Sequence, residues 1–135
     1  MKTSIVARAL TAALIGAALA GTPKLAFADI RDYEFQLIEP TVQAGAAKIV
    51  TVRLVNKKTG KPVPDAVIFA TRLDMAPDGM QEMVTKVTAM PGTEPGTYRF
   101  KADFSMAGRW QLSLAAKVQG ETGTVENKLV VTAQK

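Results

Sequence analysis

Three methionines border one short loop of the sequence. Met75, Met80 and Met83 lie on either side of Pro77, and Met106 falls in a later segment rich in turn-forming residues. The methionine thioether is a soft, uncharged ligand that selects Cu(I) or Ag(I) over harder ions. We therefore predict that these four side chains are the donors of a soft-metal site, provided that the loops bring them together.

A packing role fits the same residues. Met75 has the strand parity of the apolar residues Val67, Phe69 and Leu73, and methionine is a common filler of irregular space in protein cores. Exposed methionines would favour metal binding, whereas buried ones would favour a metal-free domain that binds another protein. The sequence leaves both interpretations open.

Residue types on which many enzymes depend are missing. The chain of 135 residues has no histidine and no cysteine, so it cannot form a Ser-His-Asp triad, a thiolate nucleophile or a Cys/His zinc site. Asp74 and Asp78 precede Gly79 but lack the ligand spacing of a calcium loop, and we interpret them as solvated loop acids. We predict a non-catalytic protein without an organic cofactor.

The first thirty residues have the pattern of a secretory signal peptide. Basic residues precede a short apolar run, and Ala26 and Ala28 supply the small residues of a cleavage site. The run is shorter than the ~20 residues that a membrane-spanning helix needs. We predict a signal peptide at 1–28 and a mature periplasmic domain at 29–135 with no membrane span.

The charge pattern does not indicate nucleic-acid binding. The chain carries 17 basic and 12 acidic residues, but Lys2, Arg8 and Lys24 belong to the predicted leader, which leaves a mature net charge of +2. The remaining arginines are scattered among carboxylates, whereas a nucleic-acid interface needs a basic face or stripe. We predict no nucleic-acid partner.

Apolar and polar residues alternate along most of the predicted domain. Alternation with period two gives a β-strand one buried and one solvated face. Turn-forming segments separate seven such runs. We predict strands at 32–38, 47–56, 65–74, 82–89, 96–104, 109–118 and 124–133.

Seven short antiparallel strands with one apolar face each predict an all-β fold, an immunoglobulin-like β-sandwich. The same alternation predicts which side chains are inside and which are outside. Predicted core residues are Trp110, Phe100, Leu112 and Leu114. Predicted solvent-facing residues are Arg99, Lys101, Arg109 and Lys117.

From about Gly45 onward, the sequence resembles the YtkA-like domain family, which is related to the FixH proteins. The matching segments are 60–66, 75–83 and 95–110. The resemblance implies an immunoglobulin-like sandwich of a kind that often accompanies heavy-metal efflux or copper-handling systems. FixH-type members are membrane-anchored accessories to cation pumps or to oxidase maturation.

Two functions follow as expectations. The first is a periplasmic accessory protein that binds Cu(I) or Ag(I) and supports metal efflux or metalloprotein assembly. Its partner would be a cell-envelope protein such as a heavy-metal efflux component. The second is a metal-free β-sandwich module that docks onto a cell-envelope protein.

Overall fold

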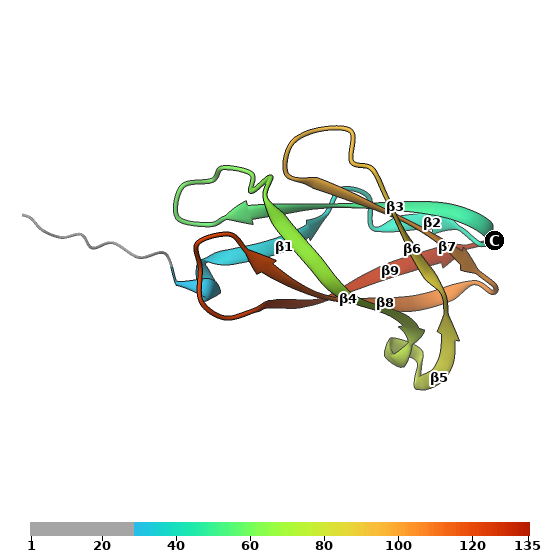
Figure 1. Ribbon diagram of the computed structural model, residues 1–135. Coiled ribbons are helices and arrows are strands. Elements are labelled where there is room, and N and C mark those ends of the chain that lie inside the picture. Colours follow the sequence, from blue (N-terminus) through green and yellow to red (C-terminus); the bar gives the residue numbers. More distant parts are fainter. Residues whose placement is uncertain (1–28) are drawn as a thin grey trace, which may run out of the picture.

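The computed structural model describes residues 29–135, which fold into two packed β-sheets (Figure 1). The predicted signal peptide and its cleavage site lie outside the described residues. Within residues 29–135, no helix has the length and hydropathy needed to cross a membrane.

One sheet contains four antiparallel strands in the order β1-β3-β7-β6. Its strands are β1 (Tyr33–Leu37), β3 (Gly45–Asn56), β7 (Thr97–Phe104) and β6 (Val87–Met90). The other sheet contains five strands in the order β2-β9-β8-β4-β5. Its strands are β2 (Thr41–Gln43), β9 (Val125–Gln134), β8 (Gly108–Val118), β4 (Ala66–Met75) and β5 (Met80–Thr85). Strand β2 runs parallel to β9, and the other pairs are antiparallel.

The predicted immunoglobulin-like sandwich is confirmed, and so are its predicted core residues. Trp110, Phe100, Leu112 and Leu114 are all buried. The Trp110 ring packs edge-on against Phe104 with 5.6 Å between ring centroids, an arrangement that aromatic pairs favour. Of the residues predicted to face solvent, Lys101, Arg109 and Lys117 are exposed and Arg99 is half-buried.

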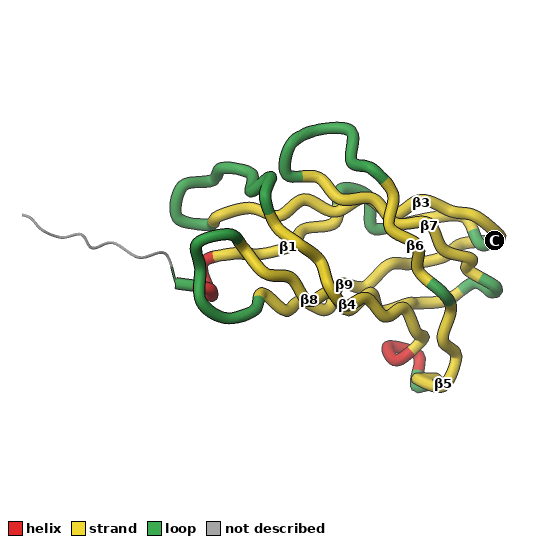
Figure 2. The backbone as a smooth tube through the Cα atoms, viewed as in Figure 1, coloured by secondary structure: helices red, strands yellow, loops and turns green. Residues whose placement is uncertain are grey.

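The number of strands differs from the prediction. The run predicted at 82–89 is divided at Lys86, because the chain leaves one sheet after β5 and enters the other with β6 (Figure 2). The segment Thr41–Gln43 adds the short strand β2, which has too few residues for a visible alternation. Nine strands therefore form the described domain.

The predicted inner face of β4 is wrong in its first half. Val67 and Phe69 are 64% and 56% exposed, whereas Leu73 and Met75 are buried. The register against β8 shifts between Ile68 and Ala70, which inserts one extra residue as a β-bulge. A bulge of one residue reverses which side chains face the core. Residues of the same sequence parity therefore face solvent before the bulge and the core after it.

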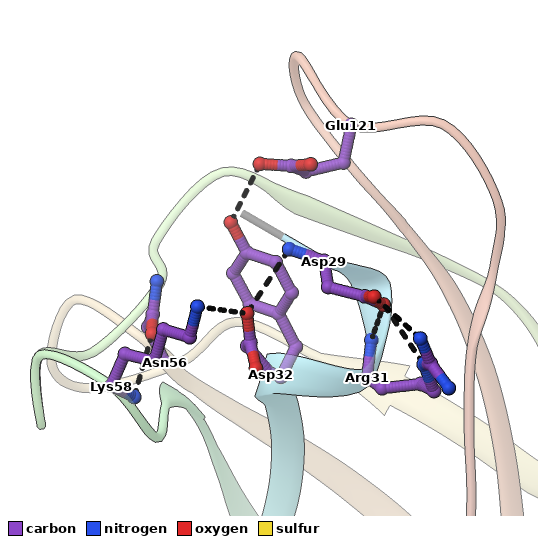
Figure 3. A network of polar contacts seen from close by, with 7 residues as sticks. Asp29, Arg31, Asp32, Asn56, Lys58 and Glu121 are labelled. Atoms are coloured by element: carbon purple, nitrogen blue, oxygen red, sulfur yellow. Dashed lines mark hydrogen bonds and ion pairs between the residues drawn. The ribbon is translucent and has the colours of Figure 1, made fainter. Parts of the chain in front are cut away.

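A short polar cap begins the described chain (Figure 3). The Asp29 carboxylate accepts a hydrogen bond from the Arg31 backbone N–H at 2.9 Å, and the Asp29 backbone nitrogen donates to Asp32 Oδ2 at 3.0 Å. Hydrogen bonds from the Arg31 side chain and backbone lower the pKa of Asp29 to about 2. These contacts close the 3-10 turn η2 (Ile30–Asp32), which leads directly into β1.

Candidate functional site

The predicted methionine loop is a tight hairpin between β4 and β5. After Met75 the chain forms the 3-10 turn η3 (Ala76–Asp78), which has Pro77 in its first turn. Gly79 ends this turn with a φ of 77°, a left-handed conformation that glycine adopts without steric cost. The hairpin makes Met75 and Met80 cross-strand partners, so their side chains share one face of the sheet.

The four predicted donors differ in exposure. Met75 is fully buried in the core. Met80 and Met83 are half-buried and pack against the same core. Met106 lies in the turn between β7 and β8 and is 41% exposed. The predicted donors therefore extend from the core to the surface.

The turn that contains Met106 lies against the β4–β5 hairpin. A Cβ atom at Gly108 would approach Met75 Cε to 2.5 Å and Asp78 Oδ2 to 2.8 Å, so any larger residue would have to displace the ends of these two side chains. The indole Nε1 of Trp110 donates a hydrogen bond to the Met106 carbonyl at 3.2 Å. The start of β8 therefore contacts the hairpin at Gly108 and holds the Met106 turn through Trp110.

Arg109 fixes the hairpin from the neighbouring strand β8. Its backbone N–H donates to Asp78 Oδ2 at 2.8 Å, and its Nε donates to Asp78 Oδ1 at 2.8 Å. Its Nη2 also donates to the Pro77 carbonyl at 2.8 Å. Hydrogen bonds from the Arg109 backbone and side chain hold the pKa of Asp78 below its usual value.

The interpretation as a solvated loop acid is wrong for Asp74, whereas Asp78 does lie at an exposed turn position. Asp74 is only 3% exposed and accepts a hydrogen bond from Arg72 Nε at 2.6 Å. Its other oxygen accepts from the Ala76 backbone N–H at 2.9 Å, which closes the start of η3. The Asp74 carboxylate is structural, because a buried charge must be paired or hydrogen-bonded, and the exposed Asp78 carboxylate is held by its hydrogen bonds from Arg109.

No local feature of the sequence predicts the Asp78–Arg109 contact. The two residues are 31 positions apart, and strand alternation predicted only that Arg109 faces outward. Their proximity depends on the pairing of β4 with β8.

The donors present at this end of the sandwich suit a soft ion. The described residues contain no cluster of three carboxylate, histidine or cysteine side chains that could hold a metal, and both nearby aspartates already accept hydrogen bonds from arginine. Thioether sulfur is a ligand type that Cu(I) accepts readily. Methionines are therefore the soft donor side chains present at this end of the described domain.

Two solved structures are similar to this chain. The chain is similar in structure to the filamin domain of Lin-41, with 17% identity, a TM-score of 0.45, and coverage of 70% of this chain and 90% of that one. It is also similar to the ZirS C-terminal domain, with 11% identity, a TM-score of 0.45, and coverage of 100% of this chain and 94% of that one. No curated protein sequence matches the chain.

The family comparison is more specific. The model of the YtkA-like family matches residues 27–115, so the match begins before Gly45, where the resemblance first became visible in the sequence. It includes the methionine hairpin and the Met106 turn. This chain belongs to the YtkA-like family.

Proposed function

We propose that this domain is a periplasmic, non-catalytic accessory protein that binds Cu(I) or Ag(I) through Met75, Met80, Met83 and Met106. In that role it would support metal efflux or metalloprotein assembly together with a cell-envelope partner. The observation that carries the proposal is the contact of the β4–β5 hairpin with Gly108, the residue that begins β8 directly after the Met106 turn. Met75 lies beside Gly108, which is two residues after Met106 in the sequence.

The surroundings of the methionine cluster, defined as Met75, Met80, Met83 and Met106, favour a soft ion over a hard one. Thioethers stay uncharged at any pH, and hard or borderline ions such as Zn(II) gain little from them. The Asp78–Arg109 contacts limit movement of the hairpin, so the donors would be held in place before the ion arrives. Met75 and the half-buried Met80 and Met83 would shield the ion from water, while Met106 would lie on its route of entry.

The absence of catalysis is part of the proposal. The sequence contains neither histidine nor cysteine, and the two aspartates at the cluster are occupied by arginine. A general base or nucleophile needs a free, positioned side chain near a substrate site. The cluster offers donors for an ion and no such group.

Burial of Met75 favours a second candidate, a metal-free interaction module. Met75 has 0% exposure and is among the largest fully buried side chains. A side chain in this position contributes to stability by packing, whether or not it has any other role. In this alternative, the cluster is core and the partner binds elsewhere on the domain.

Titration with Cu(I) separates the two candidates. The protein purified from the cell envelope would be titrated anaerobically against a chromophoric Cu(I) chelator, beside a Met75/Met80/Met83→Leu triple variant. Leucine keeps the apolar volume of methionine and removes the sulfur, so the fold should survive. We expect one Cu(I) per wild-type chain and at least about a tenfold weaker affinity in the variant.

Met90 provides the matched control. It is a half-buried methionine on β6, in the other sheet, so Met90→Leu should leave the Cu(I) affinity unchanged. Circular dichroism would verify that all variants are folded. Equal Cu(I) affinity in the wild type and the triple variant would reject the metal site and leave the interaction module.

A further inference from the structure

Strand β4 has one side that is largely without a strand partner. On one side it pairs with β8 from Ala66 to Asp74. On the other side it pairs with β5 only from Leu73 to Met75. Within residues 29–135, the segment Ala66–Arg72 thus keeps an open edge, whose backbone groups can pair with an added strand.

A groove runs beside this edge because the chain changes sheets. After β5 it crosses to the other sheet as β6 and diverges from β4 (Figure 1). The groove has a volume of about 300 Å³. It is lined by Ile68 and Phe69 of β4, Val87 and Ala89 of β6, and Tyr98 and Arg99 of β7.

One hydrogen bond shows which backbone N–H groups of β4 point away from β8. The Ala66 backbone N–H donates to the Tyr98 hydroxyl at 3.2 Å, so it faces away from β8. Backbone groups alternate in direction along a strand, so the Ile68 N–H also faces the groove. The Ala66 N–H is already taken by Tyr98, so the groups that an incoming strand can bond begin with the Ile68 N–H.

The side chains along the edge are apolar and accessible. Val67 and Phe69 are 64% and 56% exposed. Edge strands are usually protected against pairing by charged residues, by proline or by β-bulges, and the segment from Ala66 to Thr71 contains no charged residue and no proline. Arg72 at its end and the β-bulge between Ile68 and Ala70 protect this edge only in part.

The charge in the groove is positive. Arg99 is half-buried and donates from Nη1 to the Pro91 carbonyl at 3.3 Å. In the described part of the chain, it takes part in none of the four ion pairs. A ligand with a carboxylate near Arg99 would supply the missing counter-charge.

The shape of the groove selects a single strand. The wall formed by β6 and β7 stands opposite the β4 edge, so an occupant must fit between the two sheets. The edge strand of a second copy carries the other sheet of its own sandwich, which would collide with this wall. An isolated extended segment has no second sheet and can enter the groove.

We propose that the open edge Ala66–Arg72 binds an extended apolar segment of a partner protein as an added β-strand, with an acidic residue of that segment meeting Arg99. Main-chain hydrogen bonds would supply affinity, and the side-chain positions beside Phe69 and Arg99 would supply specificity. This proposal rests on the accessory role proposed above, since it gives the partner a docking surface, but it does not require the metal.

Selection from a library of random displayed peptides of about twelve residues tests the proposal with a chelator present. We expect selected peptides to alternate β-branched or aromatic residues and to carry an Asp or Glu. Phe69→Lys should weaken their binding by about tenfold or more. Val130→Lys is the matched control, because Val130 is a 44% exposed residue of β9 outside the groove, and it should leave binding unchanged.

Two further measurements distinguish strand addition from simple adhesion. Bound peptide should slow hydrogen exchange of the Ile68 amide and leave that of the Val67 amide, which faces β8, unchanged. Arg99→Glu should reverse the selected charge from acidic to basic. Failure to select any peptide, or peptides that bind Phe69→Lys as well as wild type, would overturn the proposal.

A dimer detected by analytical ultracentrifugation and abolished by Phe69→Lys would also overturn it, because a second copy would then occupy the edge. None of these outcomes depends on Cu(I). A failed metal site and a failed docking edge can therefore be told apart.

Discussion

Asp78 and Arg109 form a two-point contact between the β4–β5 hairpin and β8. Asp78 Oδ2 accepts from the Arg109 backbone N–H at 2.8 Å, and Asp78 Oδ1 accepts from Arg109 Nε at 2.8 Å. The contact pins the turn that separates Met75 from Met80. It therefore links hairpin position to the ionisation of a single carboxylate.

Asp78→Asn should lower stability near neutral pH and should have little effect in strong acid. The folded state depresses the pKa of Asp78 below its ordinary value of 3.8. Such a group contributes stability that is present above the unfolded-state pKa and lost as the pH falls through the folded-state pKa. The urea midpoints of wild type and variant should therefore differ at about pH 7. They should converge as the pH falls below 3.8 and through the lowered folded-state pKa of Asp78.

The exposed Glu39 gives the control for this pH series. Glu39→Gln should leave the urea midpoint near neutral pH unchanged. A constant gap between wild type and Asp78→Asn down to the lowest pH would contradict the assigned role of the carboxylate.

Trp110→Ala should cost about 3–5 kcal/mol of unfolding free energy. Trp110 is fully buried, stacks edge-on with Phe104 and donates to the Met106 carbonyl. The loss would be a large share of the ~5–15 kcal/mol expected for a domain. Urea unfolding followed by far-UV circular dichroism measures it.

Trp110→Phe separates the ring from its hydrogen bond. It keeps an aromatic ring in the core but removes the donor to the Met106 carbonyl, so its cost should be smaller than that of Trp110→Ala. A loss below about 1 kcal/mol for Trp110→Ala would mean that the ring is not a core residue.

Leu73→Ala and Phe69→Ala should differ sharply although both residues have the same sequence parity. Leu73 is 1% exposed and Phe69 is 56% exposed. The first change should cost about 2–5 kcal/mol, and the second less than about 1 kcal/mol. Equal losses in urea unfolding would show that the β-bulge between Ile68 and Ala70 is absent.

The processed protein should begin at or within a few residues of Asp29. Intact mass of the protein from the cell envelope tests this, and recovery of a stable full-length chain would refute it. Cleavage after Ala28 would convert the Asp29 backbone nitrogen, 3.0 Å from Asp32 Oδ2, into an ammonium group. The hydrogen bond would then be charge-assisted and stronger.

Asp32→Asn tests that consequence. It should lower the thermal midpoint of the processed chain more than that of a chain extended by a few residues before Asp29, because only the processed chain has an ammonium group there. Equal effects in both chains would show that the new terminus adds nothing to the cap.

Much of the fold was predictable because alternation is a local property. Phe100 and Leu112 lie in runs without a bulge, so period two alone placed them in the core. The division of 82–89 into β5 and β6 at Lys86 was not predictable. It depends on the two halves joining different sheets, which local alternation does not reveal. For the four methionines, the sequence provides the residue types, whereas the burial of each side chain could not be predicted from it.

The sequence by itself determined the composition of the domain's chemistry: thioethers without histidine or cysteine, and strands with one apolar face each. Tertiary structure decided that Met75 is core while Met106 is surface, that Asp78 meets Arg109, and that the edge of β4 stays open. The physical reason is that side-chain chemistry and strand period reside in neighbouring residues. Burial, ion pairing and open edges depend on which distant strands pair and in which register.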